Sequence, residues 1–191
     1  FVDFYEKVFE KLQLKPELVL DLACGTGNIT LPMARKGYDM IGLDMSVEML
    51  NIARDKAYDE ELEILFLCQD MCEMELFGTV DAIVCALDGI NYITDYEDLN
   101  RLFRLVNNYL NPGGVFVFDI NSVHKLKNIL GNNTFVNEED GIFYVWQSEF
   151  SEETSTCDFA LTFFREEEDG TYGRFDEFQQ ERAYTIEEII H

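Results

Sequence analysis

Short apolar runs alternate with amphipathic stretches over the first two-thirds of the chain. Apolar residues at helical spacing predict helices over residues 4–13, 29–36, 46–57 and 99–110. Continuous apolar runs between them predict strands over residues 18–20, 40–43, 64–68, 80–87 and 115–120. Because uniformly apolar strands separated by helices are buried on both faces, the pattern predicts a Rossmann-like, doubly wound, mostly parallel α/β sheet.

The pattern changes after Ser122. Residues 123–130 predict a short helix, and alternating apolar residues between 142 and 175 then predict an antiparallel β insertion after the fifth strand. Asp169-Gly170 is a strong hairpin signal, with residues 166–169 as a solvated rim. We expect most of the insertion's aromatic residues to form its core: Phe143, Tyr144, Trp146, Phe159, Phe163 and Phe164.

Three segments follow from this division. Residues 1–124 form the core domain, residues 125–184 the insertion, and residues 185–191 the start of a helix that returns to the core. Thr185 and Glu188 match the capping box that begins such a helix. Since Phe1 falls inside an amphipathic segment and this last helix stops after two turns, we expect a chain of 191 residues trimmed at both ends.

The chain is strongly acidic, with 38 Asp and Glu against 14 Lys and Arg and a net charge of −24. Residues 1–124 carry 22 acids and 9 bases, and residues 125–191 carry 16 acids and 5 bases. Phosphate backbones and anionic membrane surfaces both require a basic face, so we expect no nucleic-acid partner and no membrane partner. No run of about 18 apolar residues is present to span a bilayer.

Cysteine usage predicts a cytoplasmic protein without a metal site. The five cysteines (Cys24, Cys68, Cys72, Cys85 and Cys157) lie in apolar, strand-like runs, and their odd number favours reduced core thiols. Cys68 and Cys72 are spaced too widely for a Cys-x-x-Cys motif, and the chain has only two histidines, so we expect no zinc.

The first strand runs into a turn with glycine at alternate positions, Gly25 and Gly27, and then into a helix. In an open parallel sheet such a turn lies at the ligand crevice. A dinucleotide site would need a third glycine where Thr30 stands. Asp21, four residues before Gly25, would attract an amine or a hydroxyl and repel a phosphate. Both features weigh against the alternative interpretation of the chain, an NAD-dependent oxidoreductase.

Acidic residues also follow the second and third strands. Asp44 comes 17 residues after Gly27, where a carboxylate can accept hydrogen bonds from ribose hydroxyls, and Met45 after it suits the face of an adenine. Asp70, before Met71, can accept from an adenine amino group. Each of these residues alone would be explained as a helix cap or a solvated loop, but three on successive strand ends favour one binding site.

Together these motifs resemble the class I S-adenosylmethionine-dependent methyltransferases. The similar segments are residues 21–27, Asp44-Met45-Ser46 with Met49-Leu50, Asp70-Met71, residues 81–88 and the turn at residues 110–114. The chain also resembles small bacterial methyltransferases of unassigned substrate, which share Asp88-x-x-Asn91-Tyr92, an antiparallel insertion and a segment like Gln180-Glu181-Arg182-x-Tyr184.

The resemblance implies a cofactor site for S-adenosylmethionine. The methionine end is held at Asp21, Ala23, Cys24, Gly25 and Gly27. The ribose is held by Asp44, and the adenine by Met45, Met49, Asp70 and Met71. Leu87 and Asp88 lie near the sulfonium. The resemblance also implies that the family's terminal β-hairpin, and an N-terminal segment that closes over the cofactor, are missing from this chain.

The reaction implied is in-line methyl transfer to a small molecule, neutral or cationic given the acidic insertion. Asp88, Asn91, Tyr92 and His124 are the candidates to orient or deprotonate the acceptor. A structural role remains open for Asp88 and for His124, as does a third interpretation of the chain, a cofactor-binding module that does not turn over.

Overall fold

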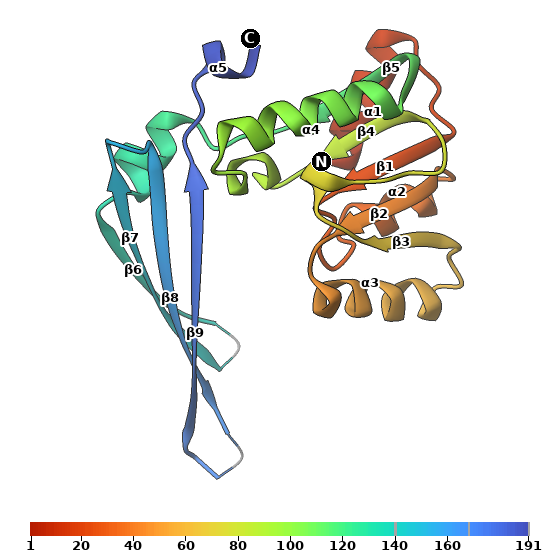
Figure 1. Ribbon diagram of the computed structural model, residues 1–191. Coiled ribbons are helices and arrows are strands. Elements are labelled where there is room, and N and C mark those ends of the chain that lie inside the picture. Colours follow the sequence, from red (N-terminus) through yellow and green to blue (C-terminus); the bar gives the residue numbers. More distant parts are fainter. Residues whose placement is uncertain (140, 168, 191) are drawn as a thin grey trace. The chain divides into compact units, whose positions relative to one another are not determined.

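The chain folds into two compact units (Figure 1). The computed structural model describes residues 1–139, 141–167 and 169–190. The first unit consists of Phe1–Ile90 and Asp95–Asp119, and the second of Asn91–Thr94 and Ile120–His191. The segment Asn91–Thr94 therefore belongs with the second unit, although the sequence pattern places it inside the core domain.

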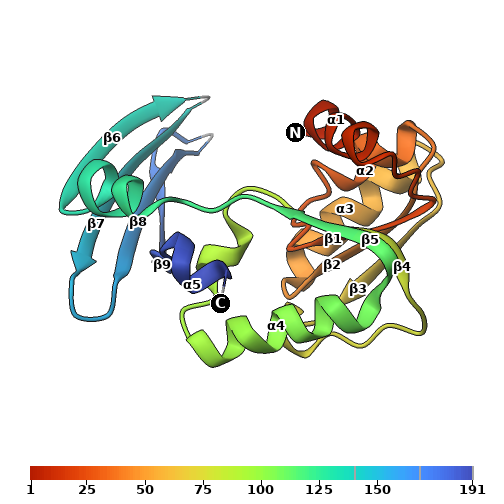
Figure 2. The same cartoon turned by 90° about the horizontal axis from the view of Figure 1, so that it is seen from above.

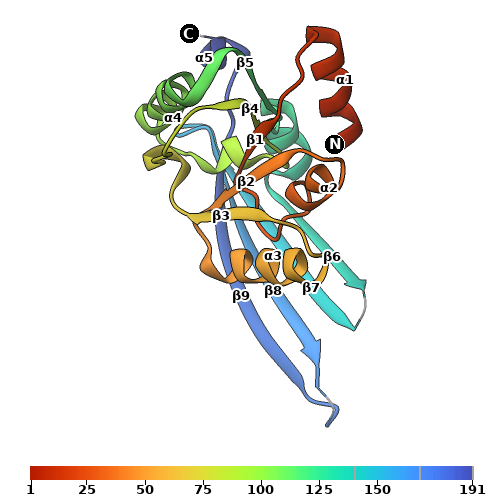
Figure 3. The same cartoon turned by 90° about the vertical axis from the view of Figure 1, so that its right-hand side faces the viewer.

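A five-stranded parallel sheet forms the centre of the first unit and confirms the predicted doubly wound architecture. Its strands are β1 (Leu18–Leu22), β2 (Asp39–Asp44), β3 (Ile64–Cys68), β4 (Val80–Cys85) and β5 (Leu110–Phe118). They lie in the order β3-β2-β1-β4-β5 (Figure 3). The strand order reverses beside β1, and in such sheets ligands bind at the carboxyl ends of the strands at this switch point.

Three helices cover one face of this sheet: α1 (Val2–Leu12), α2 (Thr30–Arg35) and α3 (Val47–Asp59). Phe9 of α1 and Met33 of α2 are buried against Val19 and Ala82 of the central strands. On α3 the apolar stripe of Leu50, Ala53 and Ala57 forms a second buried cluster with Cys24, Leu31 and Phe66. These stripes are the helical patterns that the sequence predicts.

The helix α4 (Tyr96–Tyr109) covers the other face, so the sheet lies between helices (Figure 2). Phe103 of α4 makes edge contacts with Phe116 and Phe118 of β5. Because side chains alternate along a strand, these two rings face away from Val115 and Val117, which pack against the buried cluster on the α1 side of the sheet. Two short 3-10 turns complete the connections, η1 (Met71–Glu73) and η2 (Gly89–Tyr92).

The second unit contains the expected antiparallel sheet, in the order β6-β7-β8-β9. Its elements are the π-helical turn η3 (Lys125–Leu130), β6 (Asn133–Glu139), β7 (Ile142–Ser151), β8 (Thr156–Glu166), β9 (Tyr172–Arg182) and α5 (Ile186–Ile190). The predicted hairpin joins β8 to β9, where Gly170 has a φ of +79°. Glu168 lies outside the described residues. The predicted capping box is also confirmed, because the amide of Glu188 donates to the Thr185 hydroxyl and the Glu188 carboxylate accepts from the Thr185 amide.

The prediction that most aromatic residues of the insertion form its core is wrong. The buried cluster of this unit consists of Leu126, Cys157, Phe159 and Ala183. Through Leu126, η3 packs into this cluster at one end of the sheet. Of the six predicted aromatic residues only Phe159 is buried, and the other five are partly buried: Phe143, Tyr144, Trp146, Phe163 and Phe164. The paired rings of Phe143 and Phe164 lie toward the other end of the strands, beyond the cover that η3 provides.

Several predicted strands and burials also differ from the structure. β4 ends at Cys85, two residues early, because Leu87 and Asp88 adopt left-handed backbone conformations. β5 begins at Leu110 and includes the predicted turn, with an irregular register between the pairs Val80–Leu110 and Ala82–Val115. The sequence pattern missed β6 entirely. Cys68 is exposed, whereas the other four thiols are buried as expected.

No helix in the described part of the chain has both the length and the apolar character needed to cross a membrane.

Candidate functional site

The buried carboxylate of Asp21 lies at the carboxyl end of β1, where it is 1% exposed. The hydroxyl of Thr30 donates to Asp21 Oδ2 over 2.6 Å. Burial raises the pKa of Asp21 to about 7, with a further increase from the charge of Asp44, while the hydrogen bond from Thr30 opposes the shift. Thr30, which replaces the third glycine of a dinucleotide site, thus serves to hold Asp21.

The glycine turn after β1 has a left-handed backbone. Ala23, Gly25 and Gly27 all have positive φ, at 54°, 54° and 78°. A Cβ on Gly27 would collide with the side chain of Leu31 and lie 3.3 Å from Cβ of Ala53. Glycine is therefore required both for the turn and for the close approach of α3.

Asp44 connects the end of β2 to this turn. It is 9% exposed, its Oδ2 accepts from the amide of Gly25 over 2.8 Å, and its Oδ1 accepts from the amide of Ser46 over 2.8 Å. Each carboxylate oxygen has a second lone pair for a further donor. Beside it Met45 is 75% exposed and Met49 is 46% exposed, so both thioether side chains can pack against a flat ring.

Asp70 follows β3, the strand next to β2. Its Oδ1 accepts from the amide of Cys72 over 2.8 Å, which caps η1 as the structural interpretation of this residue requires. The amide of Gln69 donates to the carbonyl of Asp44 over 3.0 Å, so the ends of β2 and β3 are joined. Asp70 and the partly buried Met71 thus lie on the same edge of the sheet as Asp44.

A fourth strand-end carboxylate, Asp119, was missed by the sequence reasoning. It accepts from the amides of Leu87 and Asp88 over 2.8 and 3.1 Å, and these two residues have φ of 57° and 59°. Consecutive left-handed residues are strained, and this carboxylate holds them. The signal that could have found Asp119 was its position after the apolar run of β5, equivalent to Asp21, Asp44 and Asp70.

Four carboxylates influence one buried thiol at the end of β4. Burial raises the pKa of the Cys85 thiol, and the charges of Asp21, Asp119, Asp88 and Asp44 raise it further. The amide of Asp119 also donates to the carbonyl of Cys85 over 3.4 Å. These acidic residues therefore converge on one region of the sheet edge, although they are spread over about a hundred residues of sequence.

The other candidate acceptor residues belong to the second unit. Asn91 is fully buried. The hydroxyl of Tyr92 donates to Gln179 Oε1 over 3.0 Å. His124 is exposed, and its Nδ1 lies 3.1 Å from Nδ2 of Asn128. Asp88, in contrast, is part of the first unit.

Buried polar groups join Asn91 to β9 within the second unit. Asn91 Nδ2 donates to the carbonyls of Asn121 and Arg182, and Asn91 Oδ1 accepts from the amide of Asn121 over 2.7 Å. Asn121 Nδ2 donates to the buried Glu181 carboxylate over 2.6 Å, and Lys125 Nζ donates to Asn121 Oδ1 over 2.6 Å. The two sequence segments shared with small bacterial methyltransferases therefore form one network.

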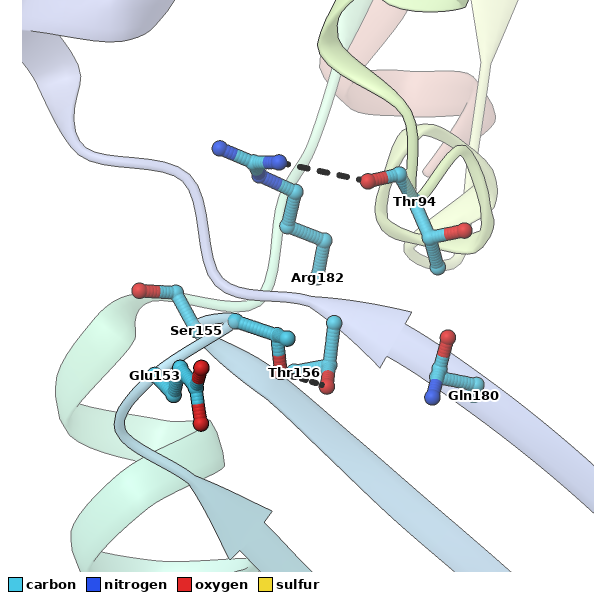
Figure 4. A pocket seen from close by; sticks show the side chains of 7 residues that line it. Thr94, Glu153, Ser155, Thr156, Gln180 and Arg182 are labelled. Carbon is cyan, nitrogen blue, oxygen red and sulfur yellow. Dashed lines mark hydrogen bonds between the residues drawn. The ribbon is translucent and has the colours of Figure 1, made fainter.

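A polar pocket of about 380 Å³ lies beside this network. Figure 4 shows Arg182 reaching the carbonyl of Thr94 over 3.3 Å, with Glu153 and Gln180 across the pocket. The remaining lining is made of small hydroxyl side chains: Thr154, Ser155 and Thr156. Within the described residues no three His, Cys, Asp or Glu side chains are grouped so that they would hold a metal ion.

Comparison with known proteins identifies the family. Residues 19–114 match the methyltransferase domain. Over 171 residues the chain is 37% identical to YqeM of Bacillus subtilis (strain 168), provisionally assigned as a methyltransferase, and the match covers 89% of this chain and 68% of that protein.

Solved structures agree with this match. An S-adenosylmethionine-dependent methyltransferase from Clostridium acetobutylicum ATCC 824 is 39% identical with a TM-score of 0.92, covering 98% of this chain and 75% of that chain. The sugar N-methyltransferase KedS8 from Streptoalloteichus sp ATCC 53650, 22% identical with a TM-score of 0.81 over 98% of this chain and 74% of that chain, shares the fold. The chain therefore belongs to the class I S-adenosylmethionine-dependent methyltransferases.

Proposed function

We propose that this methyltransferase binds its cofactor at the carboxyl edge of the first unit's sheet and methylates a small molecule. The observation that carries the proposal is the row of carboxylates at the carboxyl ends of β1, β2 and β3, namely Asp21, Asp44 and Asp70, around the glycine turn. S-adenosylmethionine presents an ammonium, a sulfonium and ribose hydroxyls, all of which suit acidic acceptors. The chemistry of these residues therefore fits the cofactor.

Each part of the edge has a proposed role. Asp21 and the backbone of Ala23, Cys24, Gly25 and Gly27 hold the methionine end of the cofactor. Asp44 accepts from the ribose hydroxyls. Leu87 and Asp88 border the sulfonium. The remaining residues recognise the adenine: Met45, Met49, Asp70 and Met71.

The cofactor supplies the activated methyl group and its leaving group, so the protein mainly has to align the acceptor. Asp88, Tyr92 and His124 are the proposed groups for orienting the acceptor or removing its proton. A general base is needed only for an acceptor that holds its proton tightly.

The charge of the second unit supports an acceptor that is neutral or cationic. Residues 125–191 carry 16 acids and 5 bases. Four of these bases form ion pairs: Lys127 with Glu152, Arg165 with Glu167, Arg174 with Asp176 and Arg182 with Glu188. The fifth, Lys125, donates to Asn121. The bases are thus engaged with acids or an amide rather than gathered for a phosphate backbone.

The residues at the glycine turn argue against the alternative function, an NAD-dependent oxidoreductase. Thr30 is fully buried against Asp21, whose carboxylate lies where a pyrophosphate would be repelled. Calorimetry separates the two interpretations. We expect S-adenosylhomocysteine to bind the chain at micromolar Kd and NAD not to bind, and the reverse order of affinities would contradict the proposal.

Turnover is tested by methyl release from radiolabelled S-adenosylmethionine with a metabolite extract and a panel of amines and alcohols. We expect a labelled small-molecule product. Cofactor binding without any labelled product would favour the non-catalytic binding module instead. Labelling of nucleic acid in the same extract would contradict the acceptor class.

A further inference from the structure

The turn after β4 has a backbone conformation that its own residues do not favour. Leu87 and Asp88 both have left-handed φ, at 57° and 59°. A bulky residue such as leucine rarely adopts this conformation, because its Cβ crowds the following carbonyl. Leu87 is also 55% exposed, so burial of its side chain does not offset the strain. Strained residues of this kind are concentrated at functional sites, and the strain must be maintained by interactions from outside the turn.

The carboxylate of Asp119 supplies these interactions from the end of the neighbouring strand, β5. Its Oδ1 accepts from the amide of Leu87 over 2.8 Å, and its Oδ2 accepts from the amide of Asp88 over 3.1 Å. Successive amides that converge on one anion form a backbone nest. Asp119 is itself joined to the end of β4, since its amide donates to the carbonyl of Cys85 over 3.4 Å. Both oxygens of this carboxylate therefore act on the turn.

These two hydrogen bonds also fix the direction of two carbonyl groups. In a trans peptide unit the carbonyl points opposite to the amide N–H. The amides of Leu87 and Asp88 share their peptide units with the carbonyls of Ala86 and Leu87. Because both amides point toward Asp119, both carbonyl oxygens point away from it.

The turn lies close to the loop after β1. Gly89 follows the two strained residues, and a Cβ on it would lie 2.7 Å from Cys85 Sγ and 3.2 Å from Cβ of Ala23. The loops after β1 and β4 thus meet beside the switch point of the sheet, where ligands bind in this class of fold. The turn held by Asp119 is therefore part of the proposed cofactor edge.

We propose that Asp119 is a positioning residue for the sulfonium of the cofactor. It acts through the backbone, because its hold on two amides aims the carbonyl oxygens of Ala86 and Leu87 at the positively charged sulfur. A carbonyl oxygen carries a partial negative charge and suits such a partner. The inference rests on the proposed cofactor site, in which Leu87 and Asp88 border the sulfonium, and adds a residue that does not itself touch the cofactor.

The test compares the affinities of two ligands by calorimetry. S-adenosylmethionine has the sulfonium, whereas S-adenosylhomocysteine has an uncharged thioether in its place. We expect Asp119→Ala to raise the Kd for S-adenosylmethionine about tenfold and the Kd for S-adenosylhomocysteine about twofold or less, because the released carbonyls contact only the charged sulfur. The ratio of the two Kd values is thus the readout.

Asp81 provides the matched control. Its Oδ2 also accepts from two successive backbone amides, those of Glu17 and Leu18, over 2.9 and 3.0 Å. It lies near the amino end of β4, at the opposite edge of the sheet from the proposed site. Asp81→Ala should lower the melting temperature, as Asp119→Ala should, but leave both Kd values unchanged. Loss of stability alone therefore does not change the ratio.

Asp119→Asn separates the positioning role from the charge of the carboxylate. It removes the charge but keeps one oxygen that can accept from a backbone amide, and it is the milder variant should Asp119→Ala not fold. Positioning predicts that its Kd for S-adenosylmethionine lies between those of the wild type and Asp119→Ala. A direct effect of charge instead predicts equal losses in both variants, which fade as salt is added.

Three results would overturn the inference: an unchanged ratio of the two Kd values in the Asp119 variants, the same change of ratio in Asp81→Ala, or equal and salt-sensitive losses in Asp119→Ala and Asp119→Asn. A wild-type chain that bound neither ligand would instead refute the proposed cofactor site.

Discussion

At the scale of single residues, Asp21 shows how a carboxylate of the proposed cofactor site opposes the stability of the fold. Its carboxylate is buried, accepts from Thr30 and has its pKa raised to about 7. A charge in such a place is unfavourable in the folded state. The residue is nevertheless suited to a cationic ligand, so the proposed role in cofactor binding would account for its unfavourable burial.

The stability of the fold should therefore depend on the ionisation of Asp21. The folded chain binds this proton more tightly than the unfolded chain, whose pKa lies near 3.8. Between these two values the unfolded state has lost the proton and the folded state keeps it, so the free energy of unfolding falls as pH rises from about 4 to about 7.

Asp21→Asn removes this dependence and can still accept from Thr30. We expect the variant to gain stability relative to the wild type as pH rises through this window, with the largest gain above pH 7. Melting curves between pH 4 and pH 8 measure it. Parallel pH dependences of wild type and variant would contradict the buried ionisation.

At the scale of elements, the glycine turn joins β1, α2 and α3. Gly27 has a φ of 78°, and a Cβ there would meet Leu31 and Ala53. Gly37 has a φ of 96° but has no atom within 4 Å of the position a Cβ would take. Both glycines relieve backbone strain, and only Gly27 also permits close packing.

This difference can be measured. Gly37→Ala should destabilise the chain by about 1 kcal/mol through backbone strain alone, and Gly27→Ala by about 1–3 kcal/mol more through overpacking. Urea unfolding gives both values. Equal losses of stability in the two variants would show that the packing of α3 does not require the absence of a side chain at Gly27.

The elements also show what sequence patterns capture. The apolar strands and amphipathic helices of the first unit were predictable because burial on two faces leaves a strong signal. β6 was not, because nearly every residue from Asn133 to Glu139 is exposed and no apolar stripe marks the strand. The left-handed turn at Leu87 and Asp88 depends on Asp119, which is distant in sequence and invisible to local patterns.

The residues of the candidate site were predictable to the extent that local sequence patterns mark their positions. Asp21, Asp44 and Asp70 were identified because each follows a recognisable strand. Asp119 follows one too, but it lies in none of the family's motifs.

At the scale of the whole molecule, acidic charge is found in both parts of the chain but serves different proposed roles. In the first unit carboxylates gather at one sheet edge, where they have defined hydrogen-bond partners. In residues 125–191 the acids outnumber the bases by 16 to 5, and Glu181 is the only buried acid that the described residues of this part contain. In the proposed function, the acidic field of this segment favours a neutral or cationic acceptor.

The central claim, a cofactor bound along the carboxyl edge of the first sheet, is tested most directly by titrating S-adenosylhomocysteine into two variants of one strand. Asp44 ends β2 at the proposed site, and the exposed Asp39 begins the same strand. Asp44→Ala should raise the Kd about tenfold or more, and Asp39→Ala should leave it unchanged. Wild-type affinity in Asp44→Ala, or equal weakening in both variants, would contradict the account.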